Sequence, residues 1–220
     1  MIFSDMEKIV FAGDSVTDMG STNPVGEGFK EGLGHGYVRM VDNLLCACYP
    51  ERRIRVINSG ISGNTSRALR NRWERDVLSM EPDYVSICIG INDVWRQFDC
   101  PARPETAVDL QEYEENLIYM IESVRGQVKQ LFLMTPYYME PNKQDTMRMR
   151  MDEYCDVIRK LAKIYDCELV DLQAMFDNYF VHRHSTFIAW DRVHPSEAGA
   201  TLIAREFLRH CGFEFYHESN

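Results

Sequence analysis

Short apolar runs rich in β-branched residues alternate along this chain with longer segments of helical periodicity, and this alternation constrains the fold most strongly. The runs cover residues 9–12, 54–58, 84–89, 130–135 and 168–172. They lack the strict polar–apolar alternation of a sheet with one solvated face. Strands of this kind, separated by helices, form a parallel sheet that is buried on both sides. We therefore expect residues 1–220 to form a single domain, a three-layer α/β/α sandwich with a central five-stranded parallel sheet.

Four segments between or after these runs place apolar residues three, four and seven positions apart, which is the spacing of one helix face. Asp109 and Ser196 precede two of these segments and are expected to cap their first turns. The four apolar faces consist of Tyr37, Val41, Leu44, Leu45 and Cys48; Tyr113, Leu117, Met120, Ile121 and Val124; Met147, Met151, Tyr154, Ile158 and Leu161; and Leu202, Ile203, Phe207 and Leu208. In a sheet of this type, functional groups are expected at the carboxyl ends of the strands.

Charge and cysteine content limit what the protein binds and where it works. The formal net charge is −10, and such an acidic surface repels phosphate backbones and anionic headgroups, so we expect no nucleic-acid or membrane partner. The N-terminus lacks the features of a signal peptide, and no apolar run approaches the roughly 18 residues of a membrane-spanning helix. The seven cysteines are odd in number and scattered, which is typical of buried reduced thiols. We predict a cytoplasmic protein and find no signal for a metal or another cofactor.

Three polar segments follow the first three strand-like runs and are expected to meet at one edge of the sheet. Ser15 comes three residues after the end of the first run, where its hydroxyl would be exposed at a helix N-terminus, although a serine there is more often a helix cap. Gly63, within residues 58–65, would present a backbone N–H that no Cβ shields. Asn92, within residues 90–93, would offer a neutral side-chain N–H to an oxyanion. Taken alone, each of the last two segments is better explained as a turn.

A fourth segment, residues 190–195, places an acid and an imidazole on one short loop before the last helix. Two residues separate Asp191 from His194, and Pro195 keeps His194 out of the α region. This spacing lets the carboxylate accept from one ring nitrogen while the other faces the Ser15 hydroxyl. The alternatives are an exposed helix entry and, less favoured, a metal site, for which the sequence offers no third ligand at a suitable spacing.

Turns explain any one of these segments but not all four in this order on one sheet edge. They predict a serine hydrolase with Ser15 as nucleophile, His194 as base and Asp191 as the group that orients the imidazole. The expected oxyanion hole consists of the Ser15 N–H, the Gly63 N–H and the Asn92 amide.

These four blocks resemble those of the GDSL, or SGNH, hydrolase family, which is named for a serine, a glycine, an asparagine and a histidine. The resemblance runs from the first strand to the last helix, and it implies the flavodoxin-like SGNH hydrolase fold. The matching residues are Ser15, Gly63, Asn92 and His194, with Asp191 as the family's aspartate. Two departures are small: the first block reads Gly-Asp-Ser-Val instead of Gly-Asp-Ser-Leu, and the third reads Gly-Ile-Asn-Asp instead of Gly-Gly-Asn-Asp. Neither departure removes a functional group.

Further segments are similar to those of the intracellular bacterial acetylxylan esterases of this family. They are residues 34–38, 60–65, 90–97, 134–136 and 189–195. This likeness implies removal of acetyl groups from xylo-oligosaccharides or related sugars, with a small-molecule acetylated sugar as substrate. Trp95 and Trp190 are candidates for walls of the acyl slot or for stacking on a sugar, and ordinary core or subunit packing explains them equally well. We also expect the protein to be a homo-oligomer.

Two other functions fit the same sequence. A lipid-ester or thioester hydrolase would share the machinery, but no long lid-like apolar insertion is present. A carbohydrate-binding protein that retained the fold without activity would also fit, yet no motif position is degraded. The basic and aromatic segment 180–187 contains His182 and His184, which we expect in a solvated loop or a subunit contact, with metal or anion binding as the alternative.

Overall fold

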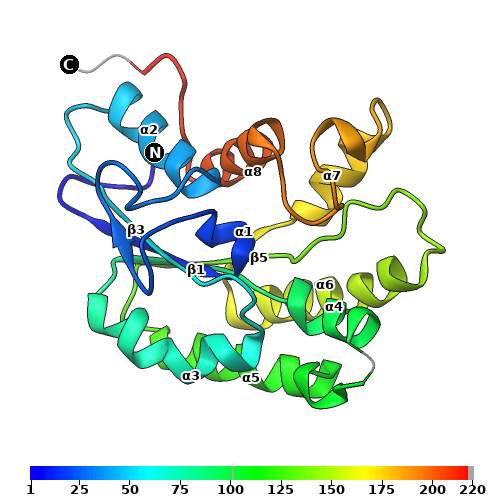
Figure 1. Ribbon diagram of the computed structural model, residues 1–220. Helices are drawn as coiled ribbons and strands as arrows, with labels where there is room; N and C mark the ends of the chain where they lie inside the picture. The colour runs from blue at the N-terminus through cyan, green and yellow to red at the C-terminus, as the bar shows by residue number, and fades with distance from the viewer. Residues whose placement is uncertain (101, 218–220) are drawn as a thin grey trace.

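In the computed structural model, which describes residues 1–100 and 102–217, a central sheet lies between two layers of helices (Figure 1). The sheet has six strands in the order β2-β3-β1-β4-β5-β6, and only β2 is antiparallel to its neighbour. The strands are β1 (Lys8–Gly13), β2 (Gly26–Glu27), β3 (Arg55–Gly60), β4 (Tyr84–Cys88), β5 (Gln130–Met134) and β6 (Glu168–Val170). The prediction of an α/β sandwich with a parallel sheet is confirmed.

The count of five strands was wrong by one, because the sequence gives no signal for β2. This strand has two residues and no apolar run, and it exists through its pairing with β3, where Gly26 lies opposite Asn58 and Glu27 opposite Ile57. At the surface, the Arg55 side chain of β3 also binds Glu27, the last residue of β2, and donates to both of its carboxylate oxygens at 2.6 and 2.8 Å. The other five strands lie where the apolar runs predict them.

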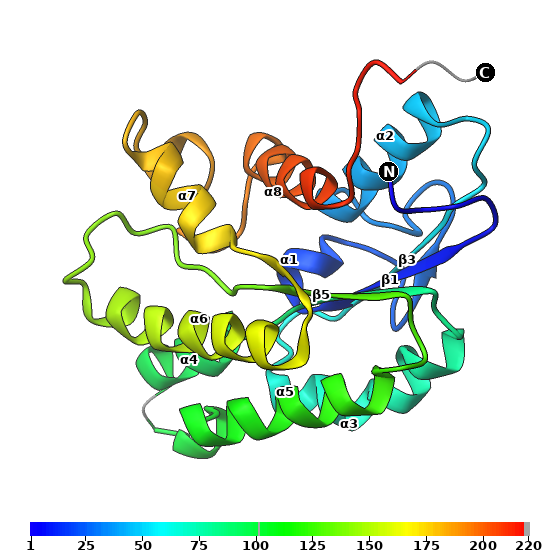
Figure 2. The same cartoon turned by 180° about the vertical axis from the view of Figure 1, so that it is seen from behind.

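Helices cover both faces of the sheet, and opposite views agree on which helix lies where (Figures 1 and 2). On one face lie α3 (Ser66–Asp76), α4 (Ile91–Asp99), α5 (Leu110–Val124) and α6 (Thr146–Tyr165). On the other lie α1 (Ser15–Asp18), α2 (Tyr37–Cys48), α7 (Leu172–Phe180) and α8 (Glu197–His210). Short 3₁₀ turns span Leu78–Met80, Pro104–Thr106 and Ser185–Phe187.

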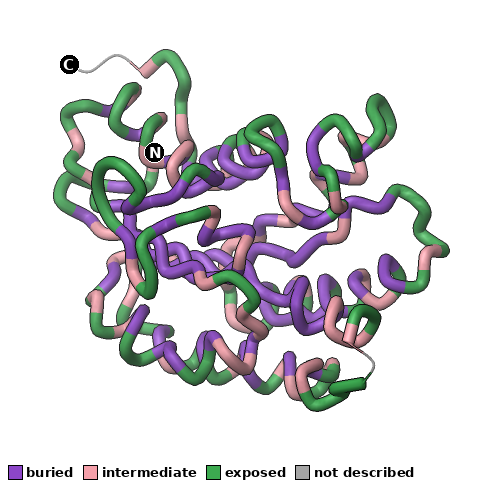
Figure 3. The backbone as a smooth tube through the Cα atoms, viewed as in Figure 1, coloured by how far each residue is buried: buried purple, intermediate pink, exposed green. Residues whose placement is uncertain are grey.

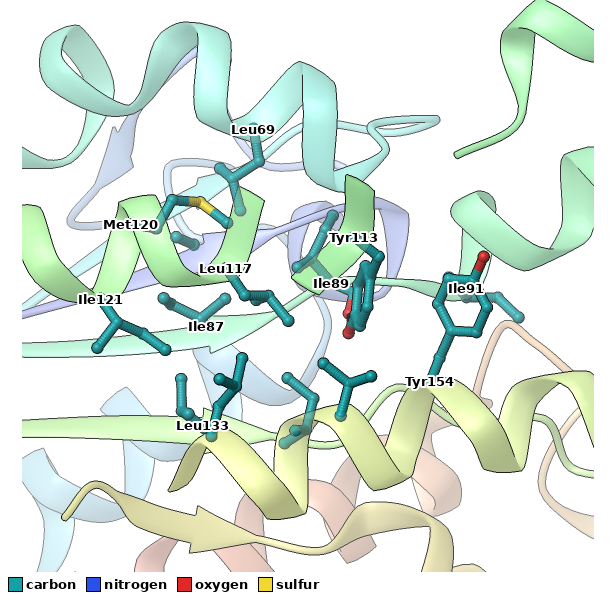
Figure 4. Close-up of a cluster of buried hydrophobic side chains, with 14 of the residues drawn as sticks. Leu69, Ile87, Ile89, Ile91, Tyr113, Leu117, Met120, Ile121, Leu133 and Tyr154 are labelled. Atoms are coloured by element: carbon teal, nitrogen blue, oxygen red, sulfur yellow. Dashed lines mark hydrogen bonds between the residues drawn. The ribbon is translucent and has the colours of Figure 1, made fainter. Parts of the chain in front are cut away.

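Burial follows this layering, with the strands buried along most of their length (Figure 3). Figure 4 shows the α5 side of the core, where Leu117 and Ile121 face Ile87 and Leu133 of the sheet. Asp109 caps α5 as predicted, because its carboxylate accepts from the Glu112 N–H at 2.9 Å. Burial on both faces explains why the strands carry no alternating polar residues.

The register of the three central strands brings the candidate site segments to one edge. Gly13 at the end of β1 pairs with Gly60 at the end of β3 and with Cys88 at the end of β4. The chain segments that follow these residues therefore begin side by side. That edge carries Ser15, the loop with Gly63 and the start of α4.

Candidate active site

Ser15 is the first residue of α1 and lies two residues after Gly13, the last residue of β1. The buried Asp14 carboxylate caps this helix by accepting from the Val16 N–H at 3.0 Å. Asp14 rather than Ser15 therefore performs the capping role that a serine here would commonly play, and the Ser15 hydroxyl is left to other partners. The Ser15 Oγ lies 2.8 Å from the His194 Nε2.

His194 is held by the loop that precedes α8. Its Nδ1 lies 2.5 Å from one oxygen of Asp191, whose other oxygen accepts from the Val193 and His194 N–H groups at 3.0 and 2.8 Å. The loop turns at Arg192, which has a left-handed φ of 65°, and its carbonyl accepts from the Met139 N–H at 2.8 Å. The carboxylate is thus fixed from both sides, and it faces the imidazole nitrogen that does not face serine.

These contacts decide the charge of Asp191. Burial alone would raise the pKa of its carboxyl, but hydrogen bonds from the His194 side chain and from two backbone N–H groups outweigh it and lower the pKa. The carboxylate is therefore ionised at neutral pH.

Gly63 lies at the tip of the loop after β3, in the left-handed region with a φ of 81°. A Cβ at this position would meet nothing within 4 Å, so the glycine is favoured by its backbone conformation rather than by crowding. The segment before Gly63 is fixed: the Ile61 N–H donates to the Gly13 carbonyl at 3.1 Å, and the Ser62 hydroxyl donates to Asp18 at 2.6 Å. The Gly63 N–H donates to no other described residue.

Asn92 lies in the first turn of α4, a helix where the sequence alone favoured a plain turn. The helix follows Gly90, whose φ is 136° and where a Cβ would lie 2.8 Å from the Tyr113 hydroxyl. The Asn92 side-chain amide donates to the Asn64 carbonyl at 3.0 Å, while its oxygen accepts from Arg96 at 3.2 Å. The amide group is therefore oriented toward the Gly63 loop and keeps one hydrogen for a substrate oxygen.

The two predicted tryptophans both lie near His194. The Trp190 ring is nearly parallel to the imidazole at 6.5 Å between centroids, and the Trp95 ring is tilted by 50° at 6.2 Å. Trp190 is 84% exposed, so it is not a core residue. Both rings lie near His194, but Trp95 is partly buried and also packs against the hydrophobic core.

Two buried acids under the site were not singled out from the sequence. Burial raises the pKa of Asp14 to about 7, and burial likewise raises that of Asp93 to about 7. Asp93 accepts from the Ser66 N–H at 3.0 Å and so joins the start of α4 to the start of α3. In the sequence, the available signal was the position of Asp14 directly before Ser15 and of Asp93 directly after Asn92. The burial of these two acids, however, is a property of the folded chain.

His182 and His184 do not join the other site residues. Both side chains are exposed, and the His184 imidazole accepts from the Thr186 N–H at the start of a 3₁₀ turn. Within residues 1–100 and 102–217, no group of three or more histidine, cysteine, aspartate or glutamate side chains is placed to hold a metal ion. In the same residues, no helix has the length and apolar character required to cross a membrane.

Known proteins resemble the chain over most of its length. A family model described as the GDSL-like lipase/acylhydrolase family matches residues 11–202. An acetylxylan esterase from Geobacillus stearothermophilus is 51% identical over 209 residues, which are 95% of each chain. An acetylxylan esterase from Xylanibacter ruminicola is 24% identical over 91% of this chain and 42% of its own.

Solved structures of related proteins also match the chain over its whole length. The crystal structure of Axe2, an acetylxylan esterase from Geobacillus stearothermophilus, covers 100% of both chains at 49% identity with a TM-score of 0.96. LAE5, described as an alpha/beta hydrolase enzyme from the metagenome of Lake Arreo, covers 100% of both chains at 45% identity with a TM-score of 0.94. Variants of Axe2 described as catalytic mutants carry the substitutions S15A, D191A and H194A.

Proposed function

The chain belongs to the GDSL-like lipase/acylhydrolase family and is a serine carboxylic-ester hydrolase; on this premise, we propose that it removes acetyl groups from xylo-oligosaccharides or related sugars. The observation that carries the proposal is the chain of hydrogen bonds from Ser15 through His194 to Asp191. The names of its relatives supply the substrate class, since two of them are acetylxylan esterases.

In the proposed reaction, the Ser15 Oγ attacks the ester carbonyl while the His194 Nε2 takes its proton. Asp191 holds the ring with Nδ1 toward the carboxylate and stabilises the imidazolium that forms. The Ser15 and Gly63 N–H groups and the Asn92 amide receive the negative charge on the carbonyl oxygen. Collapse of the intermediate expels the sugar hydroxyl, which takes the proton from His194 and leaves the acetyl group on Ser15.

Water then completes the cycle. His194 takes a proton from the water as its oxygen attacks the acetyl carbonyl, and it returns the proton to Ser15 as acetate leaves. No metal or other cofactor takes part in this scheme, because the imidazole supplies both proton transfers.

The tryptophans are assigned to the substrate. Trp190 is exposed beside His194 and is proposed to stack on the sugar, and Trp95 is proposed to border the acyl slot. We further propose that the protein is a homo-oligomer and that it is cytoplasmic. The cytoplasmic location is supported by the seven cysteines, which are all free thiols.

The test is acetate release from acetylated xylo-oligosaccharides, with acetyl, butyryl and octanoyl esters compared in parallel and Ser15→Ala as control. The proposal requires turnover of the acetylated sugar, the highest rate among simple esters on the acetyl ester, and no turnover by Ser15→Ala. A preference for octanoyl esters would support a lipid-ester hydrolase instead. Absence of turnover, with no labelling of Ser15 by an organophosphate, would support a binding protein.

A further inference from the structure

Arg72 is a buried arginine beneath the candidate active site that the proposed reaction does not use. It lies on α3, and only 7% of its side chain is exposed. Its Nε donates to the Asn64 side-chain oxygen at 2.7 Å. One terminal nitrogen donates to the Ser59 hydroxyl at 2.9 Å and to Asp76 at 3.4 Å, and the other donates to the carbonyls of Gly13 and Ser59 at 3.0 and 2.8 Å. All five N–H donors of the guanidinium therefore have acceptors.

The acceptors belong to the segments that carry the candidate oxyanion donors. Gly13 ends β1, two residues before Ser15, and its carbonyl also accepts from the Ile61 N–H in the Gly63 loop. Asn64 is the residue directly after Gly63, and its carbonyl accepts from the Asn92 side-chain amide. Each of the three candidate oxyanion donors is thus connected to the Arg72 guanidinium through only a few covalent and hydrogen bonds.

We propose that Arg72 is a positioning residue that sets the spacing between the Ser15 N–H, the Gly63 N–H and the Asn92 amide. This inference rests on the proposed function, because an oxyanion hole has meaning only for an ester hydrolase. Arg72 is separated from the substrate by the residues that it binds. It acts through the Gly13 carbonyl at the end of β1 and the Asn64 side chain in the loop after β3. The distance between these two segments must stay fixed for the three donors to converge.

The requirement is for arginine rather than for a positive charge. The guanidinium is a rigid fork whose donors point in fixed directions, whereas a lysine ammonium has three donors at one point on a flexible stem. A lysine at this position would therefore leave some of the five acceptor oxygens of Arg72 without donors. The buried charge itself is balanced by Asp76, whose side chain is 1% exposed.

Arg72→Lys and Asn64→Ala test the inference from opposite ends of one hydrogen bond. We expect each to lower kcat on an acetyl ester by about tenfold to a hundredfold, the loss that a misplacement on the order of 1 Å causes. KM is expected to change by less than about twofold, since the ester is bound by other groups. Affinity for an acetyl-sized boronic acid, which forms a tetrahedral adduct on serine, is expected to fall in parallel with kcat.

Arg75→Lys is the matched control. Arg75 lies on the same helix and binds the same Asp76 at 2.6 Å, but its side chain is 71% exposed and reaches no site segment. We expect wild-type kcat and boronic acid affinity from this variant. Rates are counted per serine labelled by an organophosphate, so that a variant that folds in part is compared only through its folded fraction.

The double variant Arg72→Lys, Asn64→Ala separates positioning from general destabilisation. If both residues act through the same contact, the losses in kcat are not additive and the double variant resembles the worse single variant. Additive losses, or wild-type kcat and boronic acid affinity in both single variants, would overturn the inference. If the wild-type protein itself fails to hydrolyse the ester, the proposed function fails first, which is a different result.

Discussion

Asp14→Asn is expected to change the pH dependence of stability, because Asp14 is a buried acid next to Ser15. Burial raises its pKa to about 7 from the ordinary value of 3.8, with a smaller contribution from the like charge of Asp93. Asparagine keeps the oxygen that accepts from the Val16 N–H. Asp14 and Tyr137 line the same small cavity, and the buried Tyr137 hydroxyl has no partner among the described residues.

The number of protons bound by the folded and the unfolded protein determines whether stability rises or falls with pH. Between about pH 4 and pH 7 the folded protein holds a proton on Asp14 that the unfolded chain has lost, so stability falls as pH rises through this window. Each pH unit is worth about 1.4 kcal/mol, so the full penalty above pH 7 is about 4 kcal/mol. Roughly 3 kcal/mol of it develops between pH 5 and pH 8. Asparagine does not titrate and escapes this loss.

The assay is urea unfolding of the wild type and Asp14→Asn at several pH values from 5 to 8. The free energy of unfolding of the variant, relative to wild type, is expected to increase by up to about 3 kcal/mol across this range. Asp109→Asn is the control, because Asp109 caps α5 through a similar hydrogen bond but is exposed to water. A difference between wild type and Asp14→Asn that stays constant from pH 5 to pH 8 would refute the reasoning.

Three further predictions concern the reaction. Asn92→Ala removes one oxyanion donor and is expected to lower kcat by about a hundredfold or more, near 3 kcal/mol of barrier, as measured by steady-state kinetics on an acetyl ester; an unchanged kcat would exclude Asn92 from the hole. Asp191→Asn is expected to lower kcat about 10⁴-fold at neutral pH, since the amide favours the wrong imidazole tautomer, and a pH–rate profile would show whether the loss persists. Trp190→Ala is expected to raise KM severalfold for an acetylated oligosaccharide but not for a small aryl acetate, and equal effects on both substrates would assign the ring a structural role.

The sequence predicted those parts of the fold that leave a local pattern. Five strands are recoverable because burial on both faces requires continuous apolar runs, and the cap of α5 is visible as Asp109 ahead of a periodic segment. The helix α7 was missed, because its start was assigned to the end of the preceding strand. Its cap Asp171, which accepts from the Ala174 N–H, was the available signal. The start of α4 looked like a turn because of Gly90, whose positive φ in fact lies just before the helix.

For the candidate site, chain order and residue type were sufficient to predict which side chains lie together, but not which residues hold them in place. Ser15, His194 and Asp191 were predicted from spacing, and the structure places them within hydrogen-bonding distance. Arg72 was not predicted, because its acceptors come from the ends of two strands and from a loop, and only the folded chain brings them together. Asp93 was missed for the same reason, since its partner Ser66 lies 27 residues earlier in the chain.

In the proposed reaction, Ser15 carries the acyl group during ester hydrolysis. This role is tested most directly by mixing the protein with an excess of an acetyl ester, quenching with acid within one turnover, and locating any added acetyl group by mass spectrometry of peptides. We expect one acetyl group on the peptide that contains Ser15, and neither an adduct nor acetate release from Ser15→Ala. Acetate release by Ser15→Ala at the wild-type rate, or an acetyl adduct on another residue that forms and decays at the rate of turnover, would contradict this role of Ser15.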